Sequence, residues 1–316
     1  MQPILSICVP TYNRLPYLKE LLEKLLPQLN DQVEVLVSDN CSDDGTWEYL
    51  LGIDNITKFR QVSNIGADPN IQSVIQRAET EYVWLLCDDD LPSMSLIANV
   101  IDAINSYYKA PLIYLRAYPM GRRGEGYNPN ISTNWTTYSF EEFLKEVGIW
   151  FTFGSSIVAR KDCLDLEFAK KWVDKSLSPA AMALSAAFYE QKVILSDVPV
   201  IAARGGNSGG YDGITVFTKN VYLLLNEFSH TLSKSTIRIV MEDSLLIVAY
   251  ILPQNSYNLS FSSFINLIKY GWHYKKFYTV IVPSLIPRSK YLSVKLSRLK
   301  AAITYFPKKF LKKIVK

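Results

Sequence analysis

The sequence lacks the features by which disulfide-bonded, zinc-binding and membrane-spanning proteins are recognised. Its four cysteines form no CxxC pair, so we expect neither a zinc knuckle nor a disulfide framework. No purely apolar run of roughly 18 residues occurs, which argues against a membrane-spanning helix, and the N-terminus lacks a signal-peptide pattern. With 14 Gly and 15 Pro in 316 residues, collagen-like and low-complexity compositions are also excluded.

Acidic residues are missing from the last part of the chain. Residues 244–316 contain 13 Lys or Arg and no Asp or Glu, whereas residues 1–243 contain 21 basic and 30 acidic residues. The formal net charge of +4 therefore combines an acidic body with a basic tail. This asymmetry predicts two surfaces with different partners, the tail contacting an anionic surface. The composition, 48% hydrophobic and 13% aromatic, is enough for a full core.

The first 110 residues alternate short apolar runs with segments of helical periodicity. The expected strands are 4–9, 33–38, 59–63, 82–87 and 112–115, and the expected helices are 15–29, 42–51, 68–78 and 93–107. Repeated β-α units of this length predict an α/β fold with a doubly wound, mostly parallel sheet and helices on both faces. Ligands of such sheets bind beyond the carboxyl ends of the strands.

The rest of the chain is less regular. We expect a long irregular loop at 116–150, strands at 151–160 and 193–200, a helix at 174–190 and a glycine-rich loop at 204–213. From about residue 216 the pattern becomes helical and aromatic, and residues 293–316 are amphipathic and basic. Such a segment is typical of a membrane-surface region. A solvated charged face is the alternative, and the acidic body argues against nucleic acid as a partner.

Polar clusters follow four of the expected strands, where the carboxyl ends of a parallel sheet meet. The residues concerned are Pro10, Thr11, Tyr12, Asn13 and Arg14, then Asp39 and Asn40, then Asn64 and Gly66, and finally Asp88, Asp89 and Asp90. We expect them to line one nucleotide-sized site. Asp39 is a plausible acceptor for a uracil-type N–H or a ribose hydroxyl, although Ser, Asp and Gly also occur in ordinary turns.

The three consecutive aspartates repel one another. Two charges ~4–6 Å apart at an effective dielectric of ~20 cost ~3–4 kcal/mol. A shared divalent cation removes this cost, and a short loop of oxygen ligands suits Mg²⁺ or Mn²⁺. The alternative is acidic capping of the following helix, but one Asp would serve for that.

Together these segments resemble the successive motifs of family 2 glycosyltransferases of the GT-A fold. The resemblance is carried by ICVPTYNR, VSDNCSDDGT, NIG and LLCDDDLP, and more loosely by GSSIVAR and the residues up to about 212. It implies metal-assisted transfer of a sugar, usually with inversion, from a UDP-, dTDP-, GDP- or CDP-linked donor. It also implies that Pro10, Thr11 and Asp39 contact the nucleoside. Asp88 and Asp90 would match the DXD motif and hold Mn²⁺ or Mg²⁺, with Asp89 as a competing choice.

The sequence departs from this family in the segment that carries the catalytic base. Many relatives have a Glu-Asp pair before a helix, whereas here the segment reads WVDKSLSPAAM. Asp174 is the nearest carboxylate and the expected base, with Glu190 and Asp162 as alternatives. The loop RGGNSGG resembles a bacterial, abequosyltransferase-like subset that acts on lipid-linked O-antigen or capsule units. Arg204 and Asn207 in it are expected at the diphosphate, although a plain glycine turn is equally consistent with the loop.

We therefore expect a catalytic domain at 1–215 and a helical, basic, membrane-surface region at 216–316. The resemblance implies a glycan or polyprenyl-diphosphate-glycan acceptor and a location in the cytoplasm, on the inner face of a bacterial cell membrane. A nucleotidyltransferase is the alternative enzyme, but those enzymes carry a glycine-rich loop where this chain has PTYNR. An inactive nucleotide-sugar-binding module is the third possibility.

Overall fold

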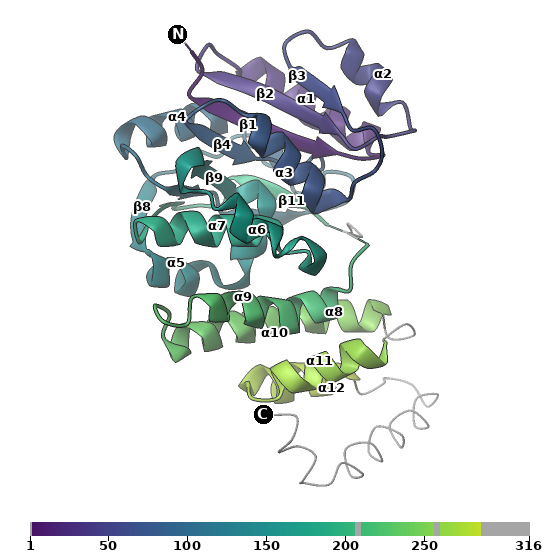
Figure 1. Cartoon of the computed structure of the whole chain (residues 1–316), viewed down its shortest axis with the longest axis vertical. Helices are drawn as coiled ribbons and strands as arrows, with labels where there is room; N and C mark the ends of the chain where they lie inside the picture. Colours follow the sequence, from purple (N-terminus) through teal and green to yellow (C-terminus); the bar gives the residue numbers. More distant parts are fainter. Residues whose placement is uncertain (1, 206–209, 256–259, 286–316) are drawn as a thin grey trace. The chain divides into compact units, whose positions relative to one another are not determined.

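The computed structural model describes residues 2–205, 210–255 and 260–285. By its internal contacts the chain divides into two compact units, Met1–Gly209 and Gly210–Lys316 (Figure 1). The division lies a few residues before the expected boundary at 215/216.

An eight-stranded mixed sheet forms the centre of the first unit, with the order β3-β2-β1-β4-β9-β6-β10-β8. Its strands are β1 (Leu5–Thr11), β2 (Val33–Asp39), β3 (Thr57–Arg60), β4 (Tyr82–Leu85), β6 (Leu112–Tyr114), β8 (Trp135–Ser139), β9 (Ile157–Arg160) and β10 (Lys192–Ser196). Pairing is parallel throughout β3-β2-β1-β4 and between β6 and β10, while β9 and β8 pair antiparallel with their neighbours. The expected mostly parallel α/β sheet is confirmed.

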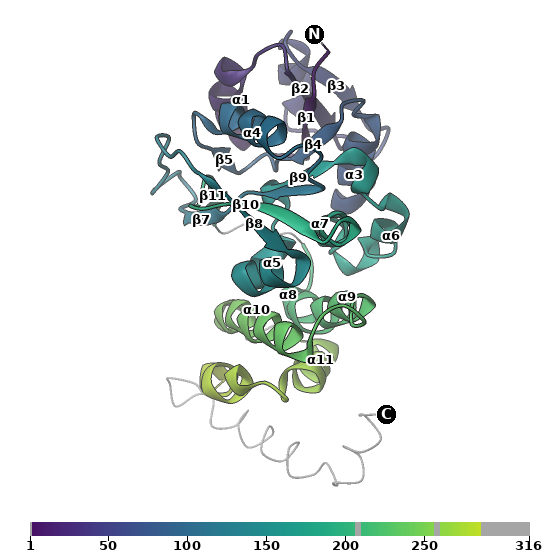
Figure 2. The same ribbon diagram turned by 90° about the vertical axis from the view of Figure 1, so that its left-hand side faces the viewer.

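Helices cover both faces of this sheet because its central strands are apolar on both sides. Helices α1 (Leu15–Leu25), α2 (Thr46–Leu51) and α4 (Leu96–Ser106) share one core with alternate residues of β1, β2 and β4. Helix α3 (Ala67–Arg77) packs on the other face with α7 (Ser178–Tyr189), as Figure 2 shows. Helix α1 illustrates the pattern, since the leucines at three- and four-residue spacing, Leu18, Leu21, Leu22 and Leu25, are the ones it buries.

A second sheet, which we did not expect, has the order β5 (Leu91–Pro92), β11 (Ile201–Arg204) and β7 (Ala117–Met120). The expectation of an irregular loop at 116–150 is therefore wrong in part: the segment holds β7, β8 and helix α5 (Phe140–Val147), while residues 121–134, between β7 and β8, are irregular. A capping box between Ser139 and Glu142 starts α5. This S-x-x-E pattern is a readable signal for a helix start, whereas the short β7 carries a proline and has no strand-like periodicity.

Short turns and helices connect these elements. In the first unit they are η1 (Leu26–Gln28), η2 (Gly148–Thr152), η3 (Gly154–Ser156), η4 (Lys161–Cys163), α6 (Leu166–Lys170) and η5 (Val173–Lys175). The strand expected at 151–160 is confined to β9, and the helix expected from residue 174 begins four residues later, at Ser178. Left-handed Ser176 separates η5 from α7.

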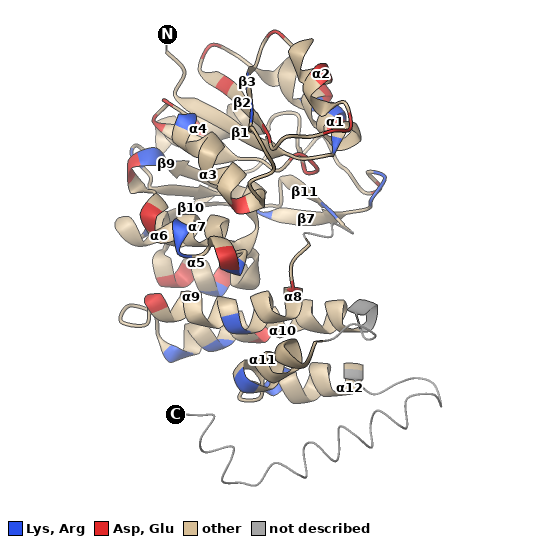
Figure 3. Ribbon diagram, turned by 45° about the vertical axis from the view of Figure 1, so that its right-hand side comes forward, with Lys and Arg blue, Asp and Glu red and all other residues tan. Residues whose placement is uncertain are grey.

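The second unit is helical in the part that the structure describes. Its elements are α8 (Gly213–Thr215), η6 (Val216–Asn220), α9 (Val221–Glu227), α10 (Lys234–Asn255), α11 (Phe261–Gly271), η7 (Phe277–Ile281) and α12 (Val282–Leu285). Their core contains Ile214, Leu245, Val248, Leu252, Leu267 and Ile281. Helix α11 carries Lys but no acidic side chain (Figure 3). Within the described ranges, no helix has the length and apolar character needed to cross a bilayer.

Candidate functional site

The carboxyl ends of β1, β2 and β4 meet through direct hydrogen bonds. Thr11 Oγ1, at the end of β1, donates to Asp88 Oδ2 at 2.7 Å, just beyond β4. The backbone N–H of Asn40, just beyond β2, donates to the carbonyl of Thr11 at 2.9 Å. The convergence expected from strand order is thus present in atomic contacts, with Thr11 at its centre.

The three aspartates that follow β4 are almost completely buried. Asp88, Asp89 and Asp90 are 2%, 4% and 3% exposed. Arg14 Nη1 lies 3.0 Å from Asp88 Oδ1 and 3.2 Å from Asp89 Oδ2, so one guanidinium is shared by two carboxylates. The site therefore concentrates carboxyl groups in a place that water hardly reaches.

Asp90 turns toward a different part of the fold. Ser155 Oγ donates to Asp90 Oδ2 at 2.6 Å, and the backbone N–H of Arg204 donates to Asp90 Oδ1 at 3.0 Å. Ser155 lies in η3, and its Oγ also accepts a hydrogen bond from Cys87 N. Ser155 is not among the residues predicted from the sequence, in which the GSS pattern is its only signal.

Burial raises the pKa of all three carboxyl groups. The pKa of Asp88 is raised to about 6 by burial and by the charge of Asp89, against the opposing effect of Arg14. The pKa of Asp90 is raised to about 8, again by burial first and the charge of Asp89 second. The pKa of Asp89 is also raised by burial. A cluster in which ionisation is this unfavourable gains stability from any added positive charge.

The oxygen ligands at this site fit a divalent cation whose remaining ligands are supplied by phosphate. Among the described residues, no group of three or more His, Cys, Asp or Glu is arranged to hold a metal alone. Mg²⁺ in nucleotide sites needs only one or two carboxylates, because substrate phosphates and water supply the other ligands. The three neighbouring carboxyl groups at residues 88–90 meet that requirement in number and kind.

The second strand end is built around Asp39, which is fully buried. The backbone N–H of Ser42 donates to both of its oxygens, at 3.1 and 3.3 Å, and Arg60 Nε lies 3.2 Å from Oδ2. Arg60, at the end of β3, was not expected at the site. Asp39 is thus held in a fixed orientation at the end of β2.

The third expected cluster, Asn64 and Gly66, is hydrogen-bonded to Asn40 of the second cluster. Asn40 Nδ2 donates to Asn64 Oδ1 at 2.9 Å and to the carbonyl of Gly66 at 3.2 Å. Asn40 Oδ1 accepts from Ile65 N at 3.0 Å. Gly66 has a φ of 92°, which favours glycine at this turn. The amide of Asn40 therefore shapes the rim.

The loop after β1 is hydrogen-bonded to the loop after β2. Asn13 Oδ1 accepts from Asp43 N at 2.9 Å, and Asn13 N donates to Ser42 Oγ at 2.9 Å. Tyr12 is 41% exposed, and Pro10 lies half-buried within β1. Thus Pro10, Tyr12 and Asn13 all lie at the rim where the sequence placed them, Tyr12 with its ring open to solvent.

Arg204 is held by protein groups. Its Nε donates to Asp89 O at 2.9 Å, its Nη1 to Arg122 O at 2.6 Å, and its Nη2 to Glu20 Oε2 at 2.6 Å. The guanidinium also lies over the Tyr17 ring, 4.9 Å from its centre, and the side chain is 3% exposed. In this arrangement Arg204 braces the acidic loop against α1. A contact with diphosphate stays a prediction for Arg204.

Two expected residues lie elsewhere. Asp174 is exposed on η5, and no hydrogen bond or ion pair involves its side chain within the described part of the chain. Asn207 lies outside the described residues.

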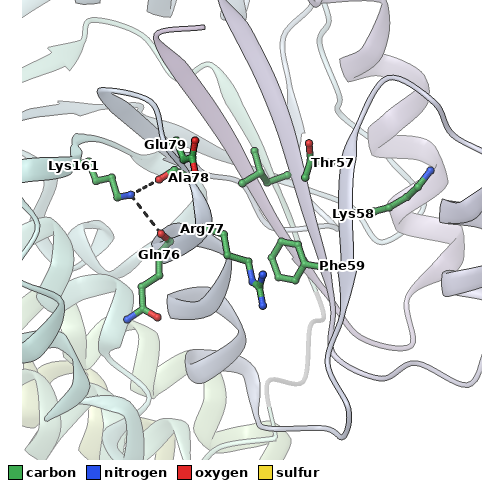
Figure 4. A pocket seen from close by; sticks show the side chains of 9 residues that line it. Thr57, Lys58, Phe59, Gln76, Arg77, Ala78, Glu79 and Lys161 are labelled. Carbon is green, nitrogen blue, oxygen red and sulfur yellow. Dashed lines mark hydrogen bonds between the residues drawn. The ribbon is translucent and has the colours of Figure 1, made fainter. Parts of the chain in front are cut away.

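A cavity of about 590 Å³ lies away from the rim, at the C-terminal end of α3 (Figure 4). Its lining includes Phe59, Arg77 and Lys161, and Lys161 Nζ donates to the carbonyls of Gln76 and Ala78. None of the residues expected at the site lines it.

Known proteins resemble this chain in sequence. The model of the family "Glycosyl transferase family 2" matches residues 6–166. Abequosyltransferase RfbV of Salmonella typhimurium is 33% identical over 115 residues, which is 33% of this chain and 34% of that protein. The putative teichuronic acid biosynthesis glycosyltransferase TuaG of Bacillus subtilis is 30% identical over 93 residues, 28% of this chain and 37% of that protein. The matches thus span about a third of the length of these curated relatives.

Solved structures share the fold at low sequence identity. S. aureus TarS 1–349 in complex with UDP has a TM-score of 0.60 and 17% identity, covering 86% of this chain and 81% of that one. The mannosyltransferase PcManGT from Pyrobaculum calidifontis, in complex with GDP-Man and Mn²⁺, has a TM-score of 0.54 and 16% identity, covering 90% and 84%. The GT-A fold expected from the sequence is confirmed.

The bracing role of Arg204 gives a stability prediction. Arg204→Ala removes three hydrogen bonds, one of them to the buried carbonyl of Asp89, so we expect the free energy of unfolding to fall by about 3 kcal/mol. Arg123→Ala, at an exposed position close by, should change it by less than about 0.5 kcal/mol. Chemical denaturation of both variants measures the difference, and equal effects would show that Arg204 does not brace the site.

Proposed function

The chain belongs to glycosyltransferase family 2, and we propose that it transfers a sugar from a nucleotide-sugar donor to a glycan hydroxyl with the help of a divalent cation. The observation that carries this proposal is the buried triple aspartate at the end of β4, bonded to Thr11 at the end of β1. Asp39 lies on the same rim, where the nucleoside would bind. Structural neighbours have been solved in complex with UDP, UDP-GlcNAc or GDP-Man, which supports a nucleotide-sugar donor.

The chain's own residues supply binding and orientation in this mechanism. Asp39 accepts a hydrogen bond from the base or ribose, and Thr11 and Arg14 fix the orientation of Asp88. Asp88 and Asp90 would hold Mn²⁺ or Mg²⁺, which when bound neutralises the charge that develops on the leaving diphosphate. A carboxylate deprotonates the acceptor hydroxyl as it attacks the opposite face of the sugar, so the configuration inverts.

We propose a membrane-linked acceptor as the second part of this function. The relatives named above are an abequosyltransferase and a putative enzyme of teichuronic acid biosynthesis, which supports a cell-surface polysaccharide such as O-antigen or capsule. A polyprenyl-diphosphate-linked glycan at the inner face of a bacterial membrane would place the acceptor beside the basic region. In the second unit, Tyr250, Phe261 and Tyr278 are 71%, 78% and 56% exposed, which suits contact with lipid headgroups.

Donor turnover tests the catalytic part. The wild type, given a panel of UDP-, GDP-, dTDP- and CDP-sugars with MnCl₂, should release nucleoside diphosphate from at least one donor, and EDTA should stop the release. Asp88→Asn and Asp90→Asn should each lower the rate at least ~100-fold, because they remove charge that the cation requires. Asp54→Asn, at an exposed position on the first unit, is the matched control and should keep the wild-type rate.

A wild type that releases nucleoside diphosphate from no donor would contradict the proposed reaction. Full activity in EDTA, or in both aspartate variants, would contradict the role of the cation.

Vesicle binding tests the membrane part. The full-length chain should sediment with vesicles that contain phosphatidylglycerol, and added salt should release it. Replacement of four lysines by Gln should weaken binding at least ~10-fold, since each basic residue near such a surface contributes ~1 kcal/mol; these are Lys308, Lys309, Lys312 and Lys313. A control variant with Gln at Lys170 and Lys171 should bind like the wild type. Equal binding to phosphatidylcholine vesicles would exclude the electrostatic mechanism.

A further inference from the structure

We propose that Asp68 is the catalytic base, the carboxylate that takes the proton from the acceptor hydroxyl. This inference rests on the proposed function, and it replaces Asp174, the residue expected from the sequence, in that role. It follows from the position of Asp68 and from its contacts across the fold.

Asp68 lies at the same rim as the nucleotide-side residues. It occupies the first turn of α3, two residues after Gly66, whose carbonyl accepts a hydrogen bond from Asn40. Asn40 in turn bonds the end of β1 through its backbone. A short chain of contacts therefore joins Asp68 to Thr11 and the acidic cluster.

The side chain of Asp68 reaches across to α7. Asp68 Oδ2 accepts a hydrogen bond from the backbone N–H of Ser178 at 3.0 Å. One turn further along α3, Gln72 Nε2 donates to Ser178 Oγ at 2.7 Å, and Ser178 is fully buried. Figures 1 and 2 show α3 and α7 side by side on one face of the sheet. Two bonds thus fix the start of α7 against α3 and fix the direction of the Asp68 carboxylate.

This contact brings a carboxylate to the segment in which the sequence suggested a base. Asp174 precedes Ser178 by four residues but is exposed on η5, and nothing in the described part of the chain orients its side chain. Asp68 is half-buried and oriented. Only one of its oxygens is used by Ser178, and the other has no hydrogen-bond partner among the described residues, which leaves it able to accept a proton.

The environment of Asp68 suits proton transfer near neutral pH. Burial raises its pKa to about 6, and the Ser178 N–H opposes that rise. No charged side chain is among the causes, including Asp174 and Lys175 on the segment that precedes α7. A base is most effective when its pKa lies near the working pH, and the Asp68 carboxyl, with one oxygen outside the Ser178 hydrogen bond, satisfies this condition.

The step balances without a further reactant. The acceptor O–H transfers its proton to Asp68 Oδ1 while the acceptor oxygen forms a bond to the anomeric carbon. The bond between that carbon and the diphosphate oxygen breaks, and its electron pair leaves with the nucleoside diphosphate. Asp68 then returns the proton to solvent.

Capping of α7 by Asp68 is the competing explanation, and Asp68→Asn separates the two. An Asn side-chain oxygen accepts the Ser178 N–H as well as an Asp oxygen does, but it takes no proton at neutral pH. The assay uses the donor and acceptor, or water, that give the fastest nucleoside diphosphate release by the wild type with MnCl₂. We expect Asp68→Asn to lower kcat at least ~100-fold. The Tm should not change, and the Kd for UDP or GDP in the presence of Mn²⁺ should stay within ~2-fold of the wild-type value. Asp68→Glu should recover part of the rate.

Two controls and a pH profile complete the test. Gln72→Ala removes the neighbouring bond to Ser178 without removing a carboxylate, and it should lower kcat less than ~5-fold; Asp174→Asn should leave kcat near the wild-type value. The wild-type kcat at saturating Mn²⁺ and donor should fall as the pH drops below about 6, because Asp68 becomes protonated. The pKa of Asp88 is also about 6, so the fall should be shallower in Asp68→Asn than in the wild type rather than absent.

An Asp68→Asn rate within ~3-fold of wild type, or an equal loss in Gln72→Ala, would overturn the assignment while leaving the proposed function intact. A large loss in Asp174→Asn alone would return the role to Asp174. A wild type without turnover is a failure of the proposed function itself, and the assignment would fall with it.

Discussion

The structure depends most on one electrostatic constraint, the burial of three consecutive carboxylates at residues 88–90 with one shared guanidinium beside two of them. Groups from three separate segments converge on this loop: Thr11 and Arg14 at the end of β1 and just after it, Ser155 before β9, and Arg204 at the end of β11. These hydrogen bonds hold three acidic groups together in a place where burial opposes their ionisation. A cation that binds there favours the ionised carboxylates, which accounts for the proposed affinity for a cation and, through it, for a diphosphate.

Much of the main sheet could be predicted because local signals and tertiary structure agree there. The apolar runs of β1, β2 and β4 and the leucine spacing of α1 reflect burial on both faces of a sheet, and the order of strands then fixes which loops meet. The second sheet could not be predicted in the same way. Strand β5 has two residues and β7 has four, including Pro119, so neither carries a period long enough to recognise.

The parts of the site that sequence reasoning missed are long-range contacts. Ser155 meets Asp90 across 65 positions, and Ser178 meets Asp68 across 110. A local reading therefore placed the base on the segment next to α7, at Asp174, whereas the structure brings a carboxylate to that segment from α3. The Asp68-Pro69 pair predicts that Asp68 lies at the start of a helix. It does not predict that Asp68 contacts Ser178, because no local pattern specifies which helix packs against α3.

A crystal structure of the full-length chain with Mn²⁺ and the nucleoside diphosphate it binds most tightly tests the central claim most directly. The account predicts anomalous manganese density in contact with at least one carboxylate of residues 88–90 and with the diphosphate, and a nucleoside beside Asp39. A nucleotide bound away from this rim, or bound at it with residues 88–90 still closed on Arg14 and no manganese present, would contradict the account.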